Sequence, residues 1–294
     1  FYLQIISSII YILYMKKPIC SPYSIKNNSD DLNDLTCFTY ENLKRIQSYW
    51  NDRHPDSTIT TDDPTELWET LNFYMKKVLC NNEMCWVRKV VTDLNISNDI
   101  FAESFVPKMP KSWVSNPREW LSDLDISKVM KQYEIAHDDF IFLGPSPIDY
   151  NVCNKMRNDW VWPELKHFSL QKYIELQPIG KTKIGIVFNL DNHTGEGTHW
   201  VALFINIVEE RIYYFDSNGN TIPANIKRLT DVIKEQGKMY DKKFTLSMNY
   251  PKVHQNKNTE CGMYVIFFIV TMLTSNKWSI FKNEKILDDE IFKY

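Results

Sequence analysis

Hydrophobic residues in the second half of the chain fall into short runs that turn residues separate. Runs of about four to eight residues rich in Val, Ile, Phe and Tyr are typical of β-strands. Ile226, Leu229, Val232 and Ile233 instead recur at helical spacing and predict a crossover helix. This pattern predicts an α+β domain with a central, mostly antiparallel sheet packed by helices. The predicted strands are residues 140–143, 183–190, 199–205, 212–215 and 244–248.

The first part of the chain has helical spacing throughout. Leu43, Ile46 and Trp50 would lie on one side of a helix. The segment Asp63–Glu66 has an oxygen cap, Pro at the first helical position and a Glu that could close a capping box. It therefore predicts the start of a second helix. The helices predicted in this part cover residues 40–50, 63–78 and 85–94.

These helices define the domain organisation that we expect. Residues 18–34 are polar and rich in turn formers, which predicts a loose arm. Residues 15–100 are expected to form an N-terminal helical domain, which must bury its apolar faces on itself or against the rest of the chain. Prolines at 107, 110 and 117 mark the passage into a second domain over residues 101–294, and Asn116–Glu119 predicts a helix start there.

The two ends of the sequence carry separate expectations. Residues 1–14 are apolar, but they are fewer than the ~20 residues that a membrane-spanning helix needs, and no basic residue precedes them. We expect either translated upstream sequence, with Met15 as the start, or a hydrophobic leader that acts as an anchor. Residues 286–294 predict the opening of an amphipathic helix.

Composition and charge exclude several classes of protein. Hydrophobic residues make up 44% of the chain and charged residues 24%, as expected for a globular protein with a sizeable core. The formal net charge of −3 gives no electrostatic reason to expect nucleic-acid binding. We expect no membrane partner unless residues 1–14 are an anchor.

The six cysteines are few and scattered for a chain of this length. We therefore expect no disulfide scaffold and a reducing, intracellular compartment. Cys80 and Cys85 flank four residues, a spacing found in some zinc sites, but no second Cys or His pair lies nearby. A redox pair or ordinary packing explains them better, and we expect neither a metal nor another cofactor.

Cys261 has the sequence context of a reactive thiol. The run Val265–Val270 that follows is apolar throughout and predicts a buried helix with Cys261 in its first turn. The N–H groups and partial positive charge of a helix N-terminus favour a thiolate. A buried structural cysteine is the alternative.

A base and a carboxylate stand upstream of Cys261. His199 opens one predicted strand and Asp216 follows the next, before the turn Ser217–Asn220. Antiparallel neighbours would bring the start of the first strand beside the end of the second. A thiol, an imidazole and a carboxylate in contact would form an activated nucleophile.

These residues and their spacing resemble those of the ubiquitin-like-protein (SUMO-type) cysteine protease superfamily, which includes the adenovirus maturation protease. The resemblance is greatest to its branch in large DNA viruses, represented by the polyprotein-processing protease of African swine fever virus. It covers the chain from about Phe105 to the end. The matching segments are Trp120–Asp123, Gly197–Ala202, Tyr214–Asn220, His254–Gln255 and Thr259–Gly262.

The resemblance implies an adenovirus-protease-like cysteine peptidase fold and assigns roles to single residues. Cys261, His199 and Asp216 would form the catalytic triad, and the Gln255 side chain with the Cys261 N–H would stabilise the oxyanion. Trp200 and Trp120 match two tryptophans that enclose substrate glycines in the cellular members. Cleavage would follow Gly-Gly-type or Gly-X-Gly-type sites. His254 is a rival base, but no carboxylate pairs with it at a recognisable distance.

The resemblance also implies a biological role, processing of viral structural polyproteins during virion maturation. The enzyme would then occur at an assembly site in the host cytoplasm and in the virion. A protease that removes SUMO or other ubiquitin-like modifiers is an alternative, as is acyl transfer by the same triad. A catalytically silent peptide-binding module is the alternative of another class.

Overall fold

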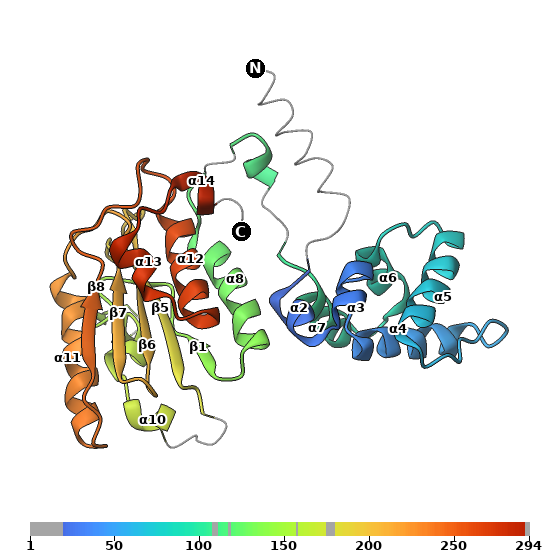
Figure 1. The fold of residues 1–294 in the computed structure, drawn as a ribbon, viewed down its shortest axis with the longest axis horizontal. Helices are drawn as coiled ribbons and strands as arrows, with labels where there is room; N and C mark the ends of the chain where they lie inside the picture. Colours follow the sequence, from blue (N-terminus) through green and yellow to red (C-terminus); the bar gives the residue numbers. More distant parts are fainter. Residues whose placement is uncertain (1–19, 108–110, 117–118, 157, 175–179, 292–294) are drawn as a thin grey trace. The chain divides into compact units, whose positions relative to one another are not determined.

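The computed structural model describes residues 20–107, 111–116, 119–156, 158–174 and 180–291 (Figure 1). The chain divides into two compact units, Phe1–Lys108 and Met109–Tyr294. A helix spans Leu94–Ser104, so a boundary at residue 100 would cut through it. The expectations for residues 1–14 lie outside the described residues. None of the helices described is long and apolar enough to cross a bilayer.

The first unit is helical. Its helices are α2 (Pro22–Asn27), α3 (Asp30–Leu35), α4 (Tyr40–Arg53), α5 (Pro64–Lys77), α6 (Glu83–Val90) and α7 (Leu94–Ser104). They bury their apolar faces against one another, in a core that includes Phe38, Leu43, Leu71 and Trp86. The sequence left open whether these helices bury their apolar faces on one another or against the rest of the chain. The structure shows that they pack on one another.

Three local expectations for this unit were wrong. The loose arm expected over residues 18–34 is wrong for the part described, residues 20–34, because Ser21 and Ser29 cap the short helices α2 and α3 through their side chains. The helix expected over 85–94 is two helices, and Asp93 caps the second. Asp63 caps α5 as expected, but Glu66 accepts a hydrogen bond from the Thr61 hydroxyl at 2.7 Å and forms no reciprocal capping box.

Two disulfides form within this unit, contrary to the expectation of no disulfide scaffold. One joins Cys20 to Cys37 and the other joins Cys80 to Cys85. Folding brings the Cα atoms of Cys20 and Cys37 within 4.9 Å, although 17 positions separate them in the sequence. Spacing alone could not reveal this approach. Among the described residues, the cysteines left as free thiols are Cys153 and Cys261.

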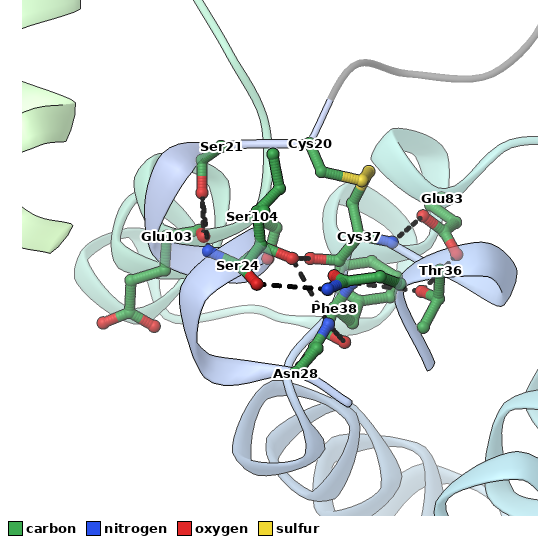
Figure 2. Close-up of a disulfide and its surroundings, with 12 residues drawn as sticks. Cys20, Ser21, Ser24, Asn28, Thr36, Cys37, Phe38, Glu83, Glu103 and Ser104 are labelled. Atoms are coloured by element: carbon green, nitrogen blue, oxygen red, sulfur yellow. Dashed lines mark hydrogen bonds between the residues drawn. A yellow bond between two sulfur atoms is a disulfide. The ribbon is translucent and has the colours of Figure 1, made fainter. Parts of the chain in front are cut away.

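A buried carboxylate lies beside both disulfides. Glu83, between Cys80 and Cys85, accepts hydrogen bonds from the Cys37 N–H at 3.2 Å and from the hydroxyl of Thr36 (Figure 2). The Trp68 indole N–H also donates to Glu83, at 2.7 Å. These bonds offset the cost of burying the carboxylate and join α3, α5 and α6.

A mixed sheet forms the centre of the second unit, in the order β1-β5-β6-β7-β8 (Figure 1). Its three central strands are antiparallel as predicted, whereas β1, β2 and β8 pair in parallel with their neighbours. The strands are β1 (Phe140–Phe142), β2 (Ser146–Pro147), β5 (Lys183–Asn189), β6 (Trp200–Asn206), β7 (Arg211–Phe215) and β8 (Thr245–Met248); β3 (Cys153–Asn154) and β4 (Asp159–Trp160) form a separate hairpin.

Helices cover both faces of this sheet. On one face α8 (Asp123–Ala136), α12 (Cys261–Thr274) and α13 (Trp278–Asn283) pack against residues such as Ala202 and Phe204. On the other face α9 (Pro163–Lys166), α10 (Leu170–Ile174) and α11 (Ala224–Lys238) pack against residues such as Val201 and Leu203. Every residue of β6 is therefore buried, which explains why its sequence is apolar from Trp200 to Ile205.

Two predicted helix boundaries differ from the structure. The helix expected to start at Asn116–Glu119 begins at Asp123, where Ser122 and Asp125 form a reciprocal capping box; residues 117 and 118 are outside the described residues. A short 3₁₀ turn, η1 (Lys111–Val114), precedes it. The helix expected over 286–294 corresponds to α14 (Asp288–Ile291), and residues 292–294 are not described.

Candidate active site

Cys261 is the first residue of α12, as predicted. It is 2% exposed and belongs to the hydrophobic core that α8, α12 and one face of the sheet share. The residue before the helix, Glu260, makes no side-chain cap. The first N–H groups of α12 thus lie beside the thiol, where their partial positive charge favours the thiolate.

The pairing of β6 with β7 places the base next to the carboxylate. Ala202 lies opposite Phe215 in this antiparallel pair. His199, just before β6, therefore meets Asp216, just after β7, with His199 Nε2 at 2.7 Å from Asp216 Oδ1. Asp216 is fully buried, and the His199 side chain is 13% exposed.

Backbone and amide groups hold Asp216 in place. The Asn218 N–H donates to Asp216 Oδ1 at 2.8 Å. The Asn249 side chain accepts from the Asp216 N–H at 3.0 Å and donates to its carbonyl at 2.7 Å. Among the described residues, Asp216 Oδ2 has no hydrogen-bond partner. Sequence reasoning missed Asn249, because a buried asparagine that follows a strand looks like a turn residue.

His199 interacts with both of its expected partners. Burial lowers the pKa of His199, but hydrogen bonds to Asp216 and Cys261 and their negative charges outweigh it and raise the pKa to about 9. Since Nε2 faces Asp216, Nδ1 is the nitrogen left for the thiol. This environment stabilises the imidazolium form of His199.

Gln255 lies in the loop that leads to Cys261. Its Oε1 accepts from the Ser217 hydroxyl at 2.7 Å, and its backbone N–H donates to the Ser217 carbonyl at 3.0 Å. The amide orientation is thereby fixed, with Nε2 as the donor end. One N–H of Nε2 bonds to the Lys257 carbonyl, and an amide nitrogen carries a second N–H.

His254 is not placed to act as a base. It is fully buried, its Nε2 donates to the Phe281 carbonyl at 2.9 Å, and its Nδ1 accepts from the Ile286 N–H at 3.3 Å. Burial is the main cause that lowers its pKa to about 4. Both ring nitrogens are thus committed in a neutral imidazole, which serves the packing of the C-terminal segment.

The two tryptophans differ in their surroundings. Trp200 is 8% exposed and its indole N–H donates to the Leu121 carbonyl at 3.1 Å, whereas Trp120 is 45% exposed. Leu121 also packs on Gly262, where an added Cβ would lie 2.8 Å from the Leu121 Cβ. Trp120 therefore precedes a residue that contacts both Trp200 and the residue after Cys261.

The described side chains offer no candidate metal site. Within the ranges described, no group of three or more His, Cys, Asp or Glu side chains could hold a metal ion. Cys80 and Cys85 form a disulfide, so their thiolates are not available for zinc.

Comparison with known proteins shows what this chain is similar to. Residues 181–292 match the Ulp1 protease family, C-terminal catalytic domain. His199, Asp216, Gln255 and Cys261 lie inside this range, and Trp120 lies outside it. Along 216 residues the chain is 28% identical to a putative thiol protease of Acanthamoeba polyphaga mimivirus, a match that covers 72% of this chain and 65% of that protein.

A second group of relatives comes from African swine fever virus. The SUMO-1 cysteine protease of a Kenyan isolate of this virus is 27% identical over 179 residues, which is 59% of this chain and 65% of that protein. The chain thus matches just under two thirds of the length of these relatives. The crystal structure of the African swine fever virus protease superposes with a TM-score of 0.59 at 20% identity, covering 94% of this chain and 95% of that one. This likeness shows a shared fold, a mixed α/β sheet packed by helices with an N-terminal helical region.

Proposed function

We propose that this chain is a cysteine endopeptidase with Cys261 as its nucleophile, a proposal supported by the match of residues 181–292 to the Ulp1 protease family. The observation that carries the proposal is the 2.7 Å contact between His199 and Asp216. Cys261, the first residue of α12, is a further cause of the raised pKa of the same imidazole. Cys261 is then the nucleophile, His199 the base and Asp216 the carboxylate that orients the base, as acyl transfer requires.

The chemistry follows from the positions of these groups. The Cys261 thiolate attacks the carbonyl carbon of the scissile peptide, and the His199 imidazolium gives its proton to the departing amine. The acyl group is then a thioester on Cys261. Neutral His199 next takes a proton from water while the water oxygen attacks the thioester carbonyl carbon. The carbon–sulfur bond then breaks, which releases the Cys261 thiolate and a carboxylic acid that gives its proton to solvent, so the thiolate and the imidazolium are restored. Asp216 keeps the imidazole oriented through Nε2 in every step.

Gln255 is proposed as an oxyanion donor together with the Cys261 N–H. We expect Gln255→Ala to lower kcat roughly 10²–10³-fold with little change in KM, because the donor acts on the charge that develops in the transition state. Asn258→Ala, an exposed residue of the same loop, is the matched control. A defect confined to KM would place Gln255 on the substrate-binding surface.

The proposed substrate is an extended peptide with small residues before the cut. The exposed face of Trp120 and the neighbouring Trp200 would form a slot that admits glycine, so cleavage is expected after Gly-Gly-type or Gly-X-Gly-type sequences. The test is hydrolysis by the full chain of matched peptides that carry a reporter after Gly-Gly, Gly-Ala-Gly or Ala-Ala. We expect turnover of the first two only. Equal cleavage of Ala-Ala would contradict the slot, and no cleavage of any peptide would contradict the endopeptidase.

The biological substrate that we favour is a viral structural polyprotein cut during virion maturation. Support comes from the source of the relatives, which are proteases of mimivirus and African swine fever virus. The enzyme would then be found at the assembly site in the host cytoplasm and in the particle. It would need Cys261 reduced while Cys20, Cys37, Cys80 and Cys85 form disulfides.

One alternative has its own support. The African swine fever virus relative is called a SUMO-1 cysteine protease, so removal of a ubiquitin-like modifier is the second candidate. A SUMO protein with a reporter on its C-terminal Gly-Gly separates the two. The comparison is of kcat/KM for this SUMO substrate and for a Gly-Gly peptide followed by further residues. A much higher kcat/KM for the SUMO substrate would favour the deconjugase.

A further inference from the structure

The loop between Gln255 and Cys261 is attached to the C-terminal segment at both of its ends. At one end the Asn256 N–H donates to Asp288 Oδ1 at 3.3 Å. At the other, the Tyr264 hydroxyl, one turn along α12 from Cys261, donates to the same oxygen at 2.9 Å. A single oxygen, Asp288 Oδ1, therefore links the two ends of the loop.

Burial makes these two hydrogen bonds consequential. Asp288 is 7% exposed and Tyr264 fully buried. Burial, followed by the hydrogen bond to Asp288 and nearby negative charge, raises the pKa of Tyr264, so the phenol stays a donor at neutral pH. The same hydroxyl lies 3.0 Å from the Ile286 carbonyl. Without these donors the buried Asp288 carboxylate would be left without hydrogen bonds, which is unfavourable. The two contacts therefore oppose separation of the loop from the C-terminal segment.

Other residues of the C-terminal segment form hydrogen bonds with the residues on either side of Gln255. The Lys285 ammonium donates to the Val253 carbonyl at 3.0 Å and to the Asn256 side chain at 3.2 Å. His254 bonds to the Phe281 carbonyl and the Ile286 N–H. Residues 253, 254 and 256 are thus all tied to residues 281–288, and α14 packs against α12 (Figure 1).

We propose that Asp288 is a positioning residue for the oxyanion hole. It sets the distance between the Gln255 loop and the start of α12, so that the Gln255 Nε2 and the Cys261 N–H face the same substrate oxygen. The inference rests on the proposed function, since the oxyanion exists only if the enzyme transfers acyl groups. Within the described chain no hydrogen bond joins Asp288 to Cys261 or to His199, so Asp288 acts through the loop and not on the reacting groups.

The experiment compares Asp288→Ala and Asp288→Asn with Asp289→Ala, an exposed carboxylate one position along α14. In Asp288→Ala we expect kcat on the Gly-Gly reporter to fall about 10²-fold, the size of loss that a misplacement of about 1 Å produces. KM and the rate at which iodoacetamide modifies Cys261 are expected to stay within about twofold of wild type. Asparagine keeps an oxygen acceptor, so Asp288→Asn is expected to recover most of the lost turnover.

Amide hydrogen exchange in residues 255–260 measures the order of the loop and does not depend on catalytic activity. Loss of protection there in Asp288→Ala, with protection intact in Asp289→Ala, supports the inference. Unchanged exchange in this loop, or a slower reaction of Cys261 with iodoacetamide that matches the loss of kcat, would overturn it. If the wild-type chain hydrolyses no Gly-Gly reporter, the proposed function fails, and the exchange measurement alone decides whether Asp288 orders the loop.

Discussion

Cys261→Ala is expected to abolish peptide hydrolysis, with a loss of roughly 10⁴-fold or more that leaves no detectable turnover. The thiol sulfur is the atom that attacks the carbonyl, and no other described group near His199 can replace it. The free thiol elsewhere in the described chain, Cys153, is exposed on the β3–β4 hairpin. Cys153→Ala is therefore the matched control and should keep full activity.

The fold must survive the Cys261→Ala substitution for the result to bear on chemistry. Alanine removes only one sulfur atom from the first turn of α12, so thermal unfolding and the circular dichroism spectrum are expected to match wild type. Hydrolysis by Cys261→Ala at even one tenth of the wild-type rate would show that the nucleophile lies elsewhere.

Asp216→Asn is expected to lower kcat/KM roughly 10²–10⁴-fold and to change its dependence on pH. In wild type, the pKa of His199 of about 9 predicts that activity falls as pH rises through 9, where the imidazolium that protonates the leaving amine is lost. Without the hydrogen bond and charge of Asp216, burial would lower that pKa, so the alkaline limb should move to lower pH.

The direction of this shift is specific to the proposed role. A histidine whose pKa is raised in the folded state also contributes stability that is complete below its ordinary value of 6.5 and is lost as pH rises through about 9. Asp216→Asn should therefore reduce stability more at pH 6 than at pH 10. An alkaline limb that stays near pH 9 in Asp216→Asn would contradict the pairing.

The sequence predicted the parts of the site that local patterns encode. The apolar run after Cys261 indicated the helix start, and two short neighbouring strands indicated the antiparallel pairing that brings His199 to Asp216. Both follow from nearest-neighbour geometry along the chain. Whether these residues catalyse remains a prediction, which the geometry makes testable.

The contacts that the sequence did not reveal are long-range and polar. Asn249 bonds to Asp216 across 33 positions, and Asp288 bonds to Asn256 across 32. Asparagine and aspartate are common in turns, so neither residue type signals a buried partner. The disulfide between Cys20 and Cys37 was missed for the same reason, since it depends on how α2, α3 and α4 fold together.

The short helices α2 and α3 have helix-start residues in their sequences, but the polar composition of this segment made a loop the expected structure. Ser21 stands before Pro22, and Ser29 before two aspartates, which are helix-start patterns within a polar segment. Their caps outweighed the absence of an extended apolar face. Only Leu32 among the hydrophobic residues of these two helices is buried in the core, which is too few for periodicity to detect.

Covalent labelling can decide whether Cys261 is an activated nucleophile beside His199. The 294-residue chain would be treated at pH 7 with a Gly-Gly peptide that ends in a thiol-reactive group, then digested and mapped by mass spectrometry. We expect one adduct, on the buried Cys261, with the exposed Cys153 unmodified and with labelling much slowed in His199→Ala. Labelling that follows exposure, with Cys153 modified faster than Cys261, would contradict it.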